Sequence, residues 1–206
     1  MRAVLQRWLW LPRPVRARAH ALLRVVLASL WITGAAQASD LAQKLHGPHH
    51  ILLIRHALAP GVGDPAHFSL QDCNTQRNLN DEGRAQAKAI GVWLKGQGLG
   101  TAQVLTSPWC RCQDTARLMD VGPVTVEPSL SSFFDQMQRA KSANQALQAM
   151  LAQRLKSKGQ QALILVTHHV NIFEFMGQNI GSGDMVLAQI KPNGQVLGHQ
   201  VIPSPR

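Results

Sequence analysis

The chain has 206 residues, 45% of them hydrophobic, which fits one globular domain with a substantial core. Its formal net charge is +10, but six of the 21 Lys and Arg, and none of the 11 Asp and Glu, lie in the first 38 residues. The remainder carries only +4 and has no dense basic stripe, which argues against a nucleic-acid-binding protein.

Residues 1–38 have the pattern of a secretory signal peptide. An Arg-rich stretch precedes the apolar run 25–35, and Ala36-Gln37-Ala38 offers an A-x-A cleavage site. The apolar run is shorter than the ~20 residues that span a bilayer, so a membrane anchor is the less favoured alternative. We therefore expect an exported, periplasmic protein that is cleaved after Ala38 and carries one domain over residues 39–206.

The first half of this domain begins with a polar lead-in over 39–48 and a buried strand over 50–54. A loop rich in Gly and Pro covers 59–78, and Asn80 is a good N-cap for a helix that ends at the glycines from Gly96 onward. A second strand over 102–105 leads to Ser107 and Pro108. These two residues are expected as N-cap and first residue of a helix that runs to about Met119.

The second half continues the alternation of strands and helices. A strand is expected over 124–126, an amphipathic helix over 143–159, a strand over 162–166 and a helix over 170–178. The unbroken apolar run 162–166 is typical of a central parallel strand. Two more strands, 185–190 and 195–202, flank a Pro-Asn-Gly turn. The pattern predicts an α/β, three-layer sandwich whose mostly parallel central sheet has helices on both faces.

Residues suited to phosphoryl transfer follow three of these strands. The first strand ends at Arg55-His56, the second leads into a helix that carries Arg111, and the strand 162–166 leads to His168-His169. Ligands of such sheets bind outside the carboxyl ends of the strands, so parallel neighbours would gather these groups in one crevice. A neutral imidazole can accept a phosphoryl group, and guanidinium groups hold phosphate oxygens.

Four segments resemble the histidine phosphatase superfamily and occur in the order of that family. They are LIRHA at 53–57 (R-H-G signature), NLNDEGRAQA at 78–87 (L-T/S-x-x-G-x-x-Q-A), TSPWCRCQDTA at 106–116 (S-S-P-x-x-R-x-x-x-T-A) and VTHHVNI at 166–172 (V-S/T-H-x-x-x-I). Ala57 and His169 stand where the family usually has Gly. The chain is most similar to small exported bacterial members, and the resemblance implies a phosphoglycerate mutase-like fold.

The resemblance also implies the roles of four residues. His56 would be the phosphate-accepting nucleophile, and Arg55, Arg111 and His168 would complete the phosphate pocket. The implied enzyme is a phosphomonoesterase or phosphohistidine phosphatase that needs no metal or other cofactor. Its substrate would be a phosphorylated small molecule or a phosphate of the cell envelope.

Weaker candidates surround this set. Arg77 lies in the loop where family members place a phosphate-contacting residue, and His169 would narrow the pocket or add a donor. The general acid of larger relatives has no clear counterpart. Asp135 is the nearest carboxylate, with Glu127 behind it.

Two other functions stay open at this point. A non-catalytic periplasmic family member that binds phosphorylated ligands would fit both Ala57 and the missing acid. A metal-binding protein could use His49-His50 with His168-His169, although the neighbouring arginines would repel a cation.

The three cysteines permit one internal disulfide in an oxidising compartment. Cys73 would pair with Cys110 or Cys112, and three free thiols are the alternative. The sequence carries no signal for the oligomeric state.

Overall fold

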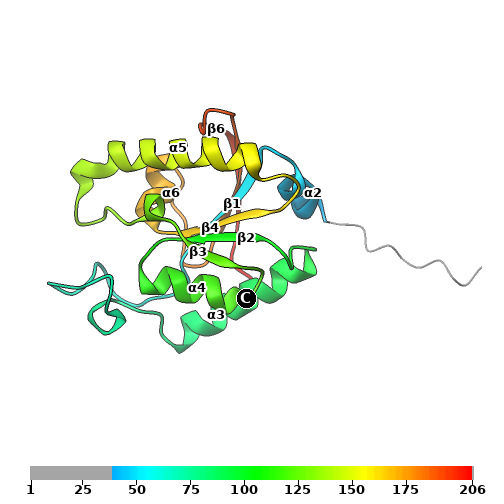
Figure 1. Ribbon diagram of the computed structural model, residues 1–206. Coiled ribbons are helices and arrows are strands. Elements are labelled where there is room, and N and C mark those ends of the chain that lie inside the picture. Colours follow the sequence, from blue (N-terminus) through cyan, green and yellow to red (C-terminus); the bar gives the residue numbers. More distant parts are fainter. Residues whose placement is uncertain (1–38, 206) are drawn as a thin grey trace, which may run out of the picture. The chain divides into compact units, whose positions relative to one another are not determined.

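The computed structural model describes residues 39–205, so the signal peptide expected over 1–38 lies outside the described residues. A six-stranded sheet with the order β3-β2-β4-β1-β5-β6 forms the middle layer (Figure 1). The strands are β1 His50–Arg55, β2 Gln103–Thr106, β3 Val124–Val126, β4 Leu163–Thr167, β5 Met185–Ile190 and β6 Val196–Ile202. The strands β1 to β4 run parallel, and the hairpin β5–β6 joins antiparallel to β1.

Helices cover both faces of this sheet, as the sequence predicts. In Figure 1, α3 and α4 lie on one side of the sheet and α5 and α6 on the other. The helices are α2 Asp40–His46, α3 Asp81–Gly96, α4 Cys110–Met119, α5 Ala140–Ser157 and α6 His169–Met176, with 3₁₀ turns at η1 Cys73–Thr75, η2 Pro128–Leu130 and η3 Met137–Arg139.

Alternate side chains of the central strands enter two separate hydrophobic cores. On β1, Leu52 and Ile54 pack with residues of α2, α3 and α4, whereas Ile51 and Leu53 pack with residues of α5 and α6. All five residues of β4 are buried, which confirms that this apolar run is a central strand covered on both faces. No helix among residues 39–205 is long and apolar enough to cross a membrane.

The polar lead-in expected over 39–48 is in fact the short helix α2. The hydroxyl of Ser39 caps it by accepting a hydrogen bond from the Ala42 amide, and Leu41, Ala42 and Leu45 are buried against the sheet layer. A seven-residue segment with three apolar residues is too short to show a helical period in its sequence. Tertiary packing therefore decides this element.

The expected start of α4 is also wrong. The helix begins at Cys110 with Trp109 as its N-cap, and no side chain caps it. The hydroxyl of Ser107 lies 2.7 Å from Nε2 of His168 and accepts a longer hydrogen bond, 3.5 Å, from the Trp109 amide. The Ser107 hydroxyl, predicted from the sequence to cap the helix, therefore forms its short hydrogen bond with the buried imidazole of His168.

Candidate active site

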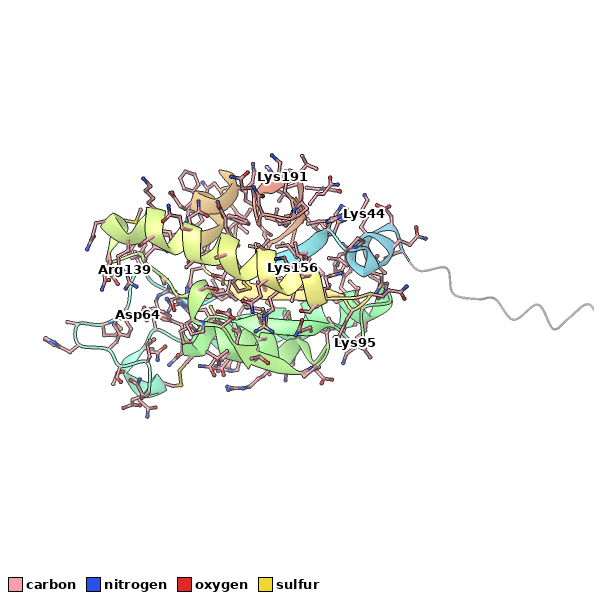
Figure 2. The ribbon with its side chains drawn as sticks, turned by 45° about the horizontal axis from the view of Figure 1, so that its top comes forward. Lys44, Asp64, Lys95, Arg139, Lys156 and Lys191 are labelled. Carbon is pink, nitrogen blue, oxygen red and sulfur yellow. A yellow bond between two sulfur atoms is a disulfide. The ribbon has the colours of Figure 1, made fainter. Side chains whose placement is uncertain are left out.

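Three neighbouring parallel strands end at one edge of the sheet and deliver the candidate residues there. β4 lies between β1 and β2. Its carbonyls also hold the residues that follow those strands, since the His56 amide donates to Thr167 O (3.0 Å) and the Ser107 amide donates to Val166 O (2.9 Å). In Figure 2 the labelled Asp64 marks this end of the molecule, and Lys44 lies at the opposite end.

A pocket with a volume of about 150 Å³ opens at this edge. One water takes ~30 Å³ of the liquid, so the pocket has room for a phosphate-sized anion. Six of the eight candidates named from the sequence line it, namely Arg55, His56, Arg77, Arg111, His168 and His169. The other lining residues are Gly61, Val62, Gly63, Asp64, Ser132, Phe134 and Val170.

His56 is held as a neutral imidazole with one nitrogen available. Its side chain is buried, and Nδ1 lies 2.8 Å from the carbonyl oxygen of Ala57. A carbonyl can only accept, so Nδ1 carries the proton and Nε2 keeps its lone pair. Burial lowers the pKa of His56 to about 3, and the nearby charges of Arg111 and Arg55 act in the same direction. The lone pair of Nε2 is therefore present at neutral pH.

His168 lies beside His56, with 5.5 Å between the ring centroids. Its Nε2 shares a hydrogen bond with the Ser107 hydroxyl, and the buried thiol of Cys112 is 3.5 Å away. Burial lowers the pKa of His168 well below its usual value, and the charge of Arg111 adds to this effect. Both imidazoles are thus uncharged in the folded protein.

Three guanidinium groups surround the pocket. Arg55 donates to Ile180 O (2.7 Å), and Arg77 donates to Gly63 O (2.7 Å) and to Ala59 O. Burial lowers the pKa of Arg55 and of Arg77, although a guanidinium stays charged at any physiological pH. The pocket therefore offers a concentrated positive charge to an anion.

Asp64 is the site residue that the sequence reading missed. Its carboxylate accepts two hydrogen bonds from Arg111 (2.8 and 3.1 Å), one from Trp109 Nε1 (3.0 Å) and one from the Arg77 amide (3.0 Å). The Asp64 and Arg111 side chains are each only 4% exposed. Burial opposes ionisation of Asp64, but these hydrogen bonds outweigh it and hold its pKa below the usual value. In a loop of Gly and Pro, an Asp gives only the signal of a turn residue.

A disulfide joins the loop 59–78 to the first residue of α4. It links Cys73 to Cys110, while Cys112 is free and buried. Of the alternatives left open by the sequence, the structure selects Cys73–Cys110. Gln76 makes a second connection, because its Oε1 accepts the Cys110 amide (2.9 Å). Both connections lie next to Arg111 and fix the loop against the helix that carries this residue.

His169 lines the outer part of the pocket, and the two carboxylates, Asp135 and Glu127, do not line it. His169 Nε2 is 2.6 Å from Asn179 Oδ1, and its ring stacks on Phe173. Asp135 is exposed and does not line the pocket. The carboxylate of Glu127 is used structurally, since it accepts hydrogen bonds from the amide and hydroxyl of Ser129.

Ala57 fits its position without strain. Among the described residues, only His67 and Asp120 combine a side chain with a positive φ, so the turn after His56 does not require glycine. The Ala57 amide donates to Thr115 Oγ1 (3.0 Å), which connects this turn to α4.

The metal-binding alternative fails on the topology of the sheet. His49 and His50 lie at the start of β1, and His168 and His169 follow the end of β4. Because these strands are parallel neighbours, the two pairs lie at opposite ends of the strands. Within residues 39–205, no group of three or more His, Cys, Asp or Glu side chains could hold a metal ion.

Comparison with known families finds one similarity. The model of the histidine phosphatase superfamily (branch 1) matches residues 51–146, a range that contains His56 and Arg111 and stops before His168. Comparison by sequence with curated proteins finds no match.

Several solved structures share the fold. The protein histidine phosphatase SixA, complexed with tungstate, is 18% identical with a TM-score of 0.51, over 75% of this chain and 97% of SixA. A mycobacterial glucosyl-3-phosphoglycerate phosphatase is 13% identical with a TM-score of 0.53, over 77% and 99%. Phosphoserine phosphatase from Entamoeba histolytica, in complex with 3-phosphoglyceric acid, is 14% identical with a TM-score of 0.53, over 73% and 95%. Identities this low establish a common fold only.

Residues 51–146 are thus similar to the histidine phosphatase superfamily (branch 1), a match that covers just under half of the chain. The fold of the chain is that of the solved phosphatases.

Proposed function

We propose that the protein is a metal-independent phosphatase that hydrolyses phosphoric monoesters through a phosphohistidine on His56. The observation that carries this proposal is the buried, neutral imidazole of His56, whose proton lies on Nδ1 and whose pocket contains three guanidinium groups. A nucleophile with a free lone pair beside concentrated positive charge is what transfer of a phosphoryl dianion requires.

The reaction has two steps. Nε2 of His56 attacks phosphorus in line, the N–P bond forms, and the P–O bond to the alcohol breaks while solvent protonates the departing oxygen. Water then attacks the phosphohistidine, which releases inorganic phosphate and restores the neutral imidazole. Arg55, Arg77 and Arg111 supply the charge that Mg²⁺ supplies in other phosphoryl-transfer sites.

The guanidinium groups also have hydrogen-bonding capacity left for an anion. The buried Nε–H groups of Arg55 and Arg111 have no partner among the described residues. A phosphate held between these side chains would provide the missing acceptors, because unpaired buried donors are rare in folded proteins. The substrate in this proposal is a phosphorylated small molecule or a phosphate of the cell envelope.

Trapping the phosphoenzyme tests the mechanism. Acid-quenched turnover of the purified protein should leave an acid-labile, base-stable phosphate on His56, and His56→Ala should abolish both the adduct and turnover without loss of the fold. His199→Ala is the matched control, since this histidine is exposed on β6. EDTA should leave the rate unchanged, and vanadate should inhibit. Near wild-type activity of His56→Ala, or loss of activity in EDTA, would contradict the mechanism.

The non-catalytic alternative predicts a different result in the same experiment. A protein that only binds phosphorylated ligands would bind vanadate and phosphate through the three arginines but would form no phosphoenzyme with any ester.

A further inference from the structure

The pocket has an apolar rim, defined here as Val62 and Phe134. The two residues come from different loops, and both line the mouth above the charged floor. Val62 is 86% exposed and Phe134 is 46% exposed. The loops approach each other closely, because a Cβ placed on Gly63 would lie 3.9 Å from Phe134 Cε1.

Val62 is exposed at the tip of a turn whose backbone is held in place by hydrogen bonds and an ion pair. Gly61 and Gly63 on either side have φ angles of 94° and 68°, a conformation that favours glycine. The turn is held from below by the hydrogen bond from Arg77 to Gly63 O and by the ion pair of Asp64 with Arg111. The chain thus presents a large apolar side chain to solvent from a fixed position at the pocket.

Single exposed apolar residues are ordinary, but two that face one pocket from separate loops form a surface for a ligand. The uncharged polar side chains in the lining, apart from His56 and His168 of the floor, are Ser132 and His169. His169 Nε2 pairs with Asn179 Oδ1, and Ser132 Oγ accepts the Phe134 amide (3.3 Å), which leaves the Ser132 O–H as a donor. Asp135 Oδ1 would lie 4.0 Å from a Cβ on Gly63, so the polar groups at the mouth are few against the several hydroxyls of a sugar phosphate.

We propose that the pocket selects phosphate esters whose alcohol carries an apolar or aromatic group next to the phosphate, with Val62 and Phe134 as the specificity-determining residues. This inference rests on the proposed function and adds a substrate class to it. The guanidinium floor binds the phosphoryl group, and the ring of Phe134 packs on the apolar group.

Binding of non-hydrolysable phosphonates tests the rim without any turnover. Methylphosphonate, phenylphosphonate and 2-naphthylphosphonate share one headgroup and differ in apolar area, and their Kd values are measured by calorimetry on the purified protein. We expect the Kd to fall by roughly tenfold with each added ring, the scale for partial burial of an aromatic ring. Similar Kd values for all three compounds would overturn the inference.

Three variants show where the selectivity resides. Phe134→Ala and Val62→Ala should each reduce the differences in Kd between the three phosphonates. Val92→Ala, at an exposed position of α3 outside the pocket, should show the same differences in Kd between the three phosphonates as the wild type. An unchanged series in the double variant Val62→Ala/Phe134→Ala would equally refute the role of the rim.

Hydrolysis is scored separately. If phenyl phosphate is not hydrolysed but the Kd falls with each added ring of the phosphonate, the proposed function is wrong and the role of the apolar rim is supported. If phenyl phosphate and glycerol 3-phosphate are hydrolysed with equal kcat/KM and the series is flat, the phosphatase stands and the rim fails.

Discussion

The burial of His56 couples the stability of the fold to pH. Its pKa is about 3 in the folded protein, chiefly because of burial, against ~6.5 for an unperturbed histidine in the unfolded chain. Between these two values the unfolded chain binds a proton that the folded protein does not bind. Stability is therefore lost as the pH falls through this window and is complete above ~6.5.

Urea unfolding at pH 7, 6 and 5 measures this effect. We expect His56 alone to reduce the free energy of unfolding by about 1.4 kcal/mol per pH unit below ~6. His56→Asn should make the dependence on pH shallower by that amount, whereas His199→Asn on the exposed face of β6 should not. Equal pH slopes for the wild type and His56→Asn would show that His56 titrates normally in the folded protein.

Asp64 is the partner on which the orientation of Arg111 depends. Both side chains are buried, so removing the carboxylate leaves an uncompensated guanidinium. We expect Asp64→Asn to lower the free energy of unfolding by about 3 kcal/mol, the scale for breaking a buried ion pair. Orthovanadate or phosphate should then raise the Tm of the variant more than that of the wild type, because the added anion replaces the missing charge.

The exposed ion pair of Asp120 with Lys95 provides the control. Asp120→Asn should unfold like the wild type and respond to phosphate like the wild type. A normal Tm for Asp64→Asn, or no extra stabilisation by phosphate, would mean that Arg111 is held by other contacts.

At the scale of elements, the disulfide Cys73–Cys110 fixes the loop 59–78 to α4. The two cysteines are 37 residues apart in sequence, and a crosslink of that span stabilises by about 4 kcal/mol in the chain-entropy account. We expect Cys73→Ser to lose up to that amount in guanidinium unfolding and to raise the KM for phosphate esters, because Arg111 follows Cys110 directly.

Reductant supplies the matched comparison for this prediction. Dithiothreitol should make the oxidised wild type unfold like Cys73→Ser and should leave Cys73→Ser itself unchanged. A reductant effect on the variant would point instead to a new disulfide that involves Cys110 or Cys112, which are both thiols once Cys73 is replaced.

The elements that sequence alone predicted well are those with a long or unbroken apolar signal. The strands β1 and β4 are continuous apolar runs, and α3 has an Asn80 cap and a buried face, so all three were expected near their actual bounds. The helix α2 was missed because it gains its stability from packing three apolar residues into a core that only the fold creates.

The site residues also divide into those that the sequence predicts and those that it does not. His56, Arg55 and His168 come directly after predictable strands, so their convergence follows from parallel pairing alone. Asp64 and the apolar rim lie on loops, whose path depends on a disulfide and on side-chain hydrogen bonds between distant residues. Nothing in the local sequence records those partners.

For the whole molecule, we propose that residues 1–38 are an export signal and that the mature protein begins at Ser39. Ser39 is the N-cap of α2 and also donates to Gln97 O (2.9 Å), so cleavage after Ala38 would leave the described fold complete. N-terminal sequencing of protein recovered from the periplasm should read Ser39 first. Recovery of the uncleaved chain in the membrane fraction would contradict this.

The arrangement of charge at the pocket has a consequence for the speed of encounter. Three arginines and one aspartate line it, so its charged side chains sum to +2 and face a dianionic ester. Such a field draws the ester in from several ångströms away and is screened over ~8–10 Å at physiological salt. Once the ester is bound, it contacts the arginines directly, so salt in the solvent no longer screens their attraction. Raising the ionic strength should therefore lower kcat/KM while kcat stays constant, and that signature would identify a site that gathers its substrate by long-range attraction.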